Sequence, residues 1–147
     1  MKKTLLQLGV ALAALQSAPL LAQNFQQQQQ LQSFATDASL QFAVESNFLP
    51  AMGYQGRLKL SNQSSVALAP GKGNWQIYLH SVRLLQPTEQ AGLKLEHVQG
   101  DLHRLTPTAA FAGLAKGQHL ELRYQGASAV VSLTDFMPRA FIVAGNL

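Results

Sequence analysis

The chain has 147 residues, of which 47% are hydrophobic and only 12% are charged, with 11 Lys and Arg against 7 Asp and Glu. This length suits one domain, and the charged fraction is about half that of an average soluble domain. Because Lys2 and Lys3 supply two of the basic residues, the rest of the chain is close to neutral, which argues against nucleic-acid binding. The absence of cysteine excludes disulfides and thiol catalysis.

The N-terminus has the pattern of a secretory signal peptide. Lys2-Lys3 precedes an apolar run over residues 4–15, and Ala22 supplies the small residue before a cleavage site. We therefore expect a signal peptide over 1–22, a mature chain from Gln23, and a periplasmic or extracellular location. An N-terminal membrane anchor is the alternative, but the run is shorter than the roughly 20 apolar residues that span a bilayer.

A glutamine-rich segment, residues 23–37, follows the expected cleavage site and contains an unbroken run from Gln26 to Gln30. Low-complexity polar sequence in this position is typical of a mobile leader. We expect no ordered structure there and place the folded domain at 38–147.

From Ala38 onward, apolar and polar residues alternate with period two, which is the pattern of half-buried strands. Turn residues separate the runs, and no window after residue 35 carries a helical apolar stripe. Seven or eight short strands in about 110 residues predict an all-β fold, a two-layer antiparallel β-sandwich, with helix almost absent outside the signal segment. The apolar runs are 38–44, 56–61, 75–80, 93–96, 120–124, 130–133 and 140–143.

The sequence lacks the common catalytic and metal-binding patterns. No serine stands in a Gly-x-Ser-x-Gly elbow, no glycine-rich phosphate loop occurs, and the four histidines lack the spacing of a common metal site. The seven carboxylates are scattered singly and are not paired for glycoside cleavage. We therefore predict no cofactor, no metal and no catalytic residue.

Aromatic residues are the candidates for ligand binding, because sugar rings stack on aromatic faces while amides bond to their hydroxyls. Strand phase places Trp75 on one face with Ile77 and Leu79, which favours the core over a binding platform for this tryptophan. Tyr78 lies on the opposite face, although a register slip of one residue would exchange the two faces. The candidate sugar-binding residues are Tyr78, Tyr54, Gln76, His80 and Trp75.

Three segments occur in the order and spacing of a known family. They are residues 74–81 (NWQIYLHS), residues 100–108 (GDLHRLTPT) continued by 111–114, and residues 135–139 (DFMPR). Together they resemble the N-terminal domain of bacterial chitobiases, the β-N-acetylhexosaminidases of glycoside hydrolase family 20.

This resemblance implies a β-sandwich similar to bacterial polysaccharide-binding domains and a non-catalytic role in binding chitin or N-acetylglucosamine oligosaccharides. In the family, the domain precedes a catalytic barrel whose adjacent Asp–Glu pair acts with the acetamido group of the substrate. This sequence has no Asp-Glu dipeptide, so no catalytic residue carries over and the chain alone is expected not to hydrolyse substrate.

The alternative function is that of a structural scaffold that packs against a family-20 catalytic domain without binding sugar. A binding module would expose aromatic rings in one plane, rimmed by amides, with Tyr78 and Tyr54 as the candidates. A scaffold would present an apolar patch without such rings, expected around Phe136, Met137, Pro138 and Phe141. Neither function involves nucleic acid, or a membrane after signal cleavage.

Overall fold

The computed structural model describes residues 17–50, 53–132, 135 and 139–144. Within these residues, one helix, α1 (Ser17–Asp37), leads into eight strands. The strands are β1 (Ala38–Ser46), β2 (Tyr54–Asn62), β3 (Trp75–His80), β4 (Thr88–Gln90), β5 (Leu93–Gln99), β6 (Leu102–Pro107), β7 (His119–Gly126) and β8 (Ala140–Ala144).

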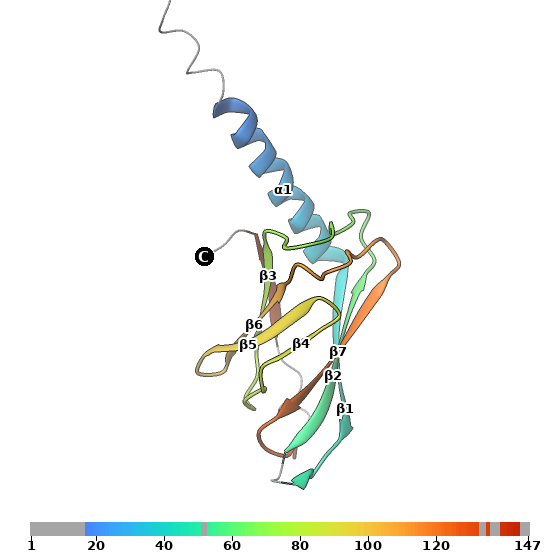
Figure 1. Cartoon of the computed structure of the whole chain (residues 1–147), viewed down its shortest axis with the longest axis vertical. Helices are drawn as coiled ribbons and strands as arrows, with labels where there is room; N and C mark the ends of the chain where they lie inside the picture. The colour runs from blue at the N-terminus through green and yellow to red at the C-terminus, as the bar shows by residue number, and fades with distance from the viewer. Residues whose placement is uncertain (1–16, 51–52, 133–134, 136–138, 145–147) are drawn as a thin grey trace, which may run out of the picture.

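The strands form two antiparallel sheets that face each other (Figure 1). One sheet has the strand order β1-β2-β7, and the other has the order β4-β5-β6-β3-β8. The core between them comes from alternate positions, as in β2, where Leu58 and Leu60 are buried while Arg57 and Lys59 face outward. The predicted two-layer antiparallel sandwich is confirmed.

Six of the seven apolar runs correspond to strands, and the structure adds β4 and β6. Strand β6 escaped prediction because a histidine occupies an inward position: His103 is fully buried, with Leu105 two residues later. The run at 130–133 was wrongly expected to be a strand. Its Val130 backbone is instead bonded by the side chain of Asn47, whose amide donates to the Val130 carbonyl (2.7 Å) and whose oxygen accepts from the Val130 N–H (3.0 Å).

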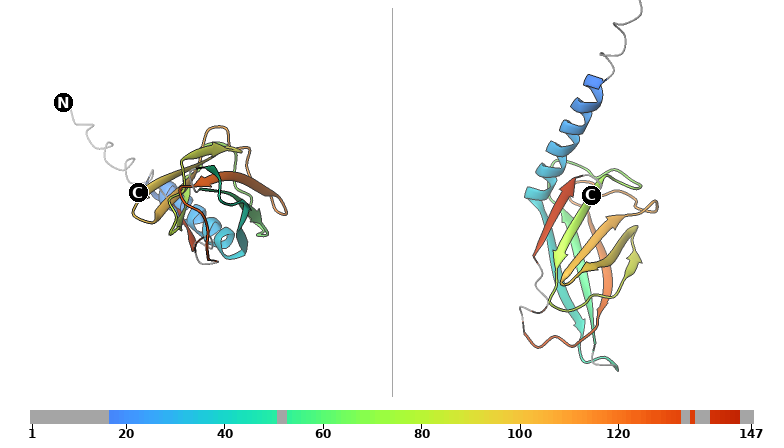
Figure 2. Two further views of the ribbon diagram at one scale, coloured as in Figure 1. Left: turned by 90° about the horizontal axis from the view of Figure 1, so that it is seen from below. Right: turned by 90° about the vertical axis from the view of Figure 1, so that its left-hand side faces the viewer.

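Helix α1 overturns the expectation that 23–37 is a mobile leader. Gln, Leu and Ala favour helix, and two apolar residues three positions apart, Leu31 and Phe34, lie on one face and join the core with 6% and 1% exposure. The last turns therefore pack against the sandwich beside β8, whereas residues 25–30 are exposed and the helix projects from one end of the sandwich (Figures 1 and 2). Most of the expected signal peptide, residues 1–16, lies outside the described residues.

Candidate functional site

The outer face of the five-stranded sheet gathers three of the sequence-predicted residues on β3. Gln76, Tyr78 and His80 alternate with the core residues, so their predicted strand phase is correct. The Tyr78 hydroxyl donates a hydrogen bond to Gln76 Oε1 at 2.9 Å. Both side chains are only 6% exposed, however, so Tyr78 is not the open ring that the sequence suggested.

Phe141 on β8 provides the exposed ring of this face. It stands opposite Tyr78 in the β3–β8 ladder, and the two rings stack with centroids 5.5 Å apart and planes 15° from parallel. Phe141 is 49% exposed, whereas Tyr78 is almost covered. Phe141 therefore presents aromatic surface to solvent while Tyr78 supports it. The sequence analysis placed Phe141 in the candidate scaffold patch, where the next domain of the family would follow. Strand phase alone does not show that β8 pairs with β3 at the sheet edge.

His80 and Asp101 border the exposed ring. The imidazole lies 6.3 Å from the Phe141 ring, measured between centroids, and its Nδ1 lies 3.2 Å from Asp101 Oδ2. The contact with His80 lowers the pKa of the Asp101 carboxyl. Both side chains are exposed, so the edge of the ring is lined by groups that donate and accept hydrogen bonds.

Charged residues continue the same row across β6 and β5. Arg104 is the ladder partner of Tyr78 on one side and of Glu96 on the other. Its guanidinium bonds Glu96 Oε1, and Lys94 Nζ lies 2.7 Å from Glu96 Oε2. Lys94 and then Arg104 hold the pKa of Glu96 below its usual value, and Glu96 raises the pKa of Arg104. The charges are thus paired, and they fix the polar side chains beside the aromatic pair.

Trp75 and Tyr54 do not belong to a surface site. Trp75 is 3% exposed and packs edge-on against Phe111, which confirms the core position favoured by its phase. Tyr54 is fully buried, so its expected place on an exposed platform is wrong. Its ring meets Tyr124 edge-on and covers Gly126, where an added Cβ would lie 1.8 Å from the Tyr54 ring. Burial raises the pKa of the Tyr54 hydroxyl.

The outer face of the three-stranded sheet is a contrasting surface of ion pairs. Arg57 contacts Glu45 and Glu121 at 3.4 Å, and Arg123 Nε lies 2.9 Å from Glu45. The outward positions of the described strands β1, β2 and β7 carry no Phe, Tyr or Trp. Among the described strands, the exposed aromatic surface therefore lies on the five-stranded sheet.

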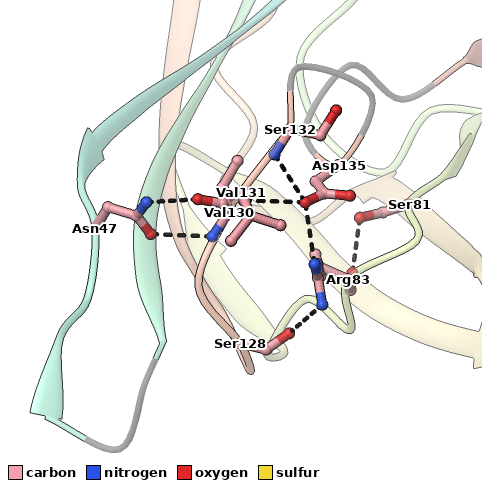
Figure 3. Close-up of polar contacts among 8 residues, drawn as sticks. All are labelled: Asn47, Ser81, Arg83, Ser128, Val130, Val131, Ser132 and Asp135. Atoms are coloured by element: carbon pink, nitrogen blue, oxygen red, sulfur yellow. Dashed lines mark hydrogen bonds and ion pairs between the residues drawn. The ribbon is translucent and has the colours of Figure 1, made fainter.

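A polar network connects three loops at the end of the sandwich away from α1, which contain Asn47, Arg83 and residues 128–135 respectively (Figure 3). Arg83 donates to Ser128 Oγ at 3.1 Å and to Asp135 Oδ2 at 3.0 Å. The same carboxylate oxygen accepts from the backbone N–H groups of Val131 and Ser132. The Val131 N–H and then Arg83 lower the pKa of Asp135.

Exposed apolar side chains flank this network. Phe48 is 63% exposed and Val131 is 76% exposed, each beside the Asn47–Val130 contact, while Val82 (71%) and Leu84 (44%) border Arg83. Phe48 also has a φ of +54°, an uncommon conformation for a residue with a side chain. We call these four side chains the loop-end patch. Of the patch expected from sequence, residues 136–138 lie outside the described residues and Phe141 lies on the sheet face.

The described part of the chain lacks two further kinds of feature. It holds no group of three His, Cys, Asp or Glu side chains suited to a metal ion. Nor does it contain a helix long and apolar enough to cross a membrane.

Comparison with known proteins identifies the family. The CHB_HEX family, described as "Putative carbohydrate binding domain", matches residues 23–147. The chain belongs to this family. N,N'-diacetylchitobiase of Vibrio harveyi is 42% identical over 73 residues, which are 50% of this chain and 8% of that protein. Beta-hexosaminidase of Vibrio vulnificus is 31% identical over 94 residues, which are 64% of this chain and 11% of that protein. The CHB_HEX chain thus spans a small part of either relative.

Solved structures share the fold. A GH20 exo-β-N-acetylglucosaminidase from Vibrio harveyi, in complex with N-acetylglucosamine, has a TM-score of 0.54 at 16% identity, covering 75% of this chain and 18% of that chain. CBM3b of the scaffoldin subunit ScaA from Acetivibrio cellulolyticus has a TM-score of 0.50 at 10% identity, covering 78% and 99%. At these identities the likeness concerns the fold alone.

Proposed function

We propose that this CHB_HEX domain binds chitin or N-acetylglucosamine oligosaccharides through the outer face of its five-stranded sheet. One observation carries the proposal: Phe141 is half exposed on this face and is stacked on the buried Tyr78. A ring held in one orientation by a neighbour stacks on a sugar with little loss of side-chain freedom. His80 and Asp101 at its edge supply hydrogen-bond donors and acceptors for sugar hydroxyls.

The domain acts, in this proposal, without hydrolysing the glycan. A general acid for glycoside cleavage needs a raised pKa, whereas neighbouring cations and hydrogen-bond donors lower the pKa of Glu96, Asp101 and Asp135. The chain should release no product from a chromogenic N-acetylglucosaminide. Turnover that copurifies with the protein would contradict this part of the proposal.

We also propose that the domain is part of a secreted β-N-acetylhexosaminidase, located in the periplasm or outside the cell. The N-terminal pattern supports secretion, and the family of the chain supports the parent enzyme. Sequencing the N-terminus of the protein recovered from the periplasm or medium tests the location. A mature chain beginning at Gln23 is expected, and retention of the whole protein in the cytoplasm would contradict it.

A pull-down on insoluble chitin tests the binding function. Isolated aromatic sites bind weakly, so we expect a Kd between millimolar and micromolar, about −4 to −8 kcal/mol. Phe141→Ala should weaken retention by about tenfold through loss of stacking. Phe48→Ala removes a comparably exposed phenylalanine at the loop-end patch and should leave retention unchanged. Equal retention of wild type and Phe141→Ala would contradict the site.

The loop-end patch supports the second candidate function, docking against a family-20 catalytic domain. Hydrogen bonds of the neighbouring residues Asn47 and Arg83 fix the loops that carry these exposed side chains, and exposed apolar groups on fixed loops favour protein contact over sugar stacking. Capture of a separately expressed family-20 barrel by wild type, and loss of capture with Val131→Asp, would support docking. Capture that is unaffected by this substitution would place the contact elsewhere.

A further inference from the structure

A hollow with a mixed polar and apolar lining lies at the end of the same sheet face nearest α1. Its volume is about 360 Å³, and its lining includes Lys72, Asn74, Gln76, Thr106 and Pro107. A second cavity of about 470 Å³ shares Lys72, Thr106 and Pro107 with the hollow, so the two lie next to each other at the end of β6.

The wall of the hollow is anchored in the core. Gly73 lies against the Trp75 indole, because an added Cβ there would be 2.4 Å from Trp75 Nε1. The Gly71 N–H donates to the Phe111 carbonyl at 2.8 Å, and the Phe111 ring packs against the same indole. The loop that carries Asn74 is therefore positioned by buried side chains.

Register relates the hollow to the exposed ring. Ile77 pairs with Leu105, so Gln76 on β3 and Thr106 on β6 lie side by side. Phe141 pairs with Tyr78, so Gln76 is one strand and Thr106 is two strands away from β8, and both are offset from Phe141 by two residues along the strands. Strand spacing and rise place the hollow about 8–12 Å from that ring. A glycan of several linked sugars that stacks one ring on Phe141 is therefore long enough to place a further sugar unit in the hollow.

The lining chemistry suits an acetamido group. That group has one N–H donor, one carbonyl acceptor and an apolar methyl. The Asn74 amide, which is exposed, both donates and accepts, Lys72 donates, and Pro107 supplies apolar surface.

We infer that this hollow is a second subsite that recognises the acetamido group of another sugar in the chain that stacks on Phe141. The inference rests on the proposed function and adds a division of roles. The aromatic pair binds the sugar ring whatever its substituents, whereas Asn74 selects N-acetylated chains over chains that carry only hydroxyls, because those leave its hydrogen-bonding groups unmatched.

Calorimetric titration with chitotetraose and cellotetraose tests the inference. Wild type should bind chitotetraose about tenfold more tightly, the scale of one or two hydrogen bonds. Asn74→Leu should weaken chitotetraose binding until the two affinities agree within about threefold. Phe141→Ala should weaken both while preserving their ratio. Gln41→Leu, an exposed amide on the opposite sheet, is the matched control and should behave as wild type.

The results distinguish a wrong subsite assignment from an absence of sugar binding. If Asn74→Leu keeps the preference for chitotetraose, or if an oligosaccharide of uronic acids binds better than either neutral chain, the subsite assignment is wrong while sugar binding stands. If wild type binds neither oligosaccharide nor insoluble chitin, the proposed function itself fails.

Discussion

Phe34→Ala probes whether α1 is an integral part of the domain. Phe34 is 1% exposed inside the core cluster, and Phe-to-Ala changes at such sites cost about 3–5 kcal/mol. Among the side chains of α1 that the structure describes, Leu31 is the other core residue, and burying two large apolar side chains contributes about 3–6 kcal/mol before ordering entropy is subtracted. Undocking of the helix therefore limits the loss, and we expect about 3 kcal/mol.

Phe25→Ala is the matched control, because Phe25 lies on the same helix with 61% of its surface exposed. For a chain of this length, a 3 kcal/mol loss corresponds to a Tm lower by about 6–12 °C in calorimetry, whereas the control should change little. Limited proteolysis should also cut near residue 37 more rapidly in Phe34→Ala. Equal Tm values for the two variants would refute the docking of α1 and restore the mobile leader predicted from sequence.

Three further predictions concern buried polar groups. Desolvation lowers the pKa of His103, so the unfolded chain binds a proton that the folded state resists, and the free energy of unfolding should be flat above about pH 6.5 and fall below it. In urea titrations between pH 7 and 5, His103→Gln should remove this pH dependence. An unchanged slope would contradict the prediction. Asn62→Ala removes the donor of a part-buried bond (2.8 Å) and a buried bond (2.9 Å) to backbone carbonyls, and should cost about 2–3 kcal/mol in urea unfolding. A loss below about 0.5 kcal/mol would be incompatible with those bonds. Arg83→Met should lower the Tm more than Asp135→Asn, since an amide oxygen still accepts from the two backbone N–H groups; the reverse order would contradict the network.

The sandwich could be predicted from sequence because alternation directly reports which residues of a strand face the core. Leu58, Leu60 and Leu122 follow that rule, as does Trp75. Helix α1 could not be predicted in the same way. The residues of α1 that pack in the core, Leu31 and Phe34, stand within a glutamine-rich segment, which hides the apolar face from a sequence pattern. The helix is ordered by tertiary packing, which helix propensity does not reveal.

The candidate site was predicted by strand phase but not by exposure. Phase correctly grouped Gln76, Tyr78 and His80, yet it carries no information about which strand lies alongside. Because β8 pairs with β3, Phe141 covers Tyr78 and becomes the exposed ring. Tyr54 was misplaced for a related reason: its cross-strand neighbour is Gly126, and the ring fills the space above that glycine.

The most direct test of sugar binding at the five-stranded sheet is an amide NMR titration of the whole chain with chitotetraose. The account predicts saturable shift changes along β3 and β8, centred on Tyr78 and Phe141 and extending to Asn74, with the β2–β7 face around Arg57 unaffected. Shift changes confined to the β2–β7 face or to the loop-end patch would contradict it, as would an unchanged spectrum at millimolar ligand.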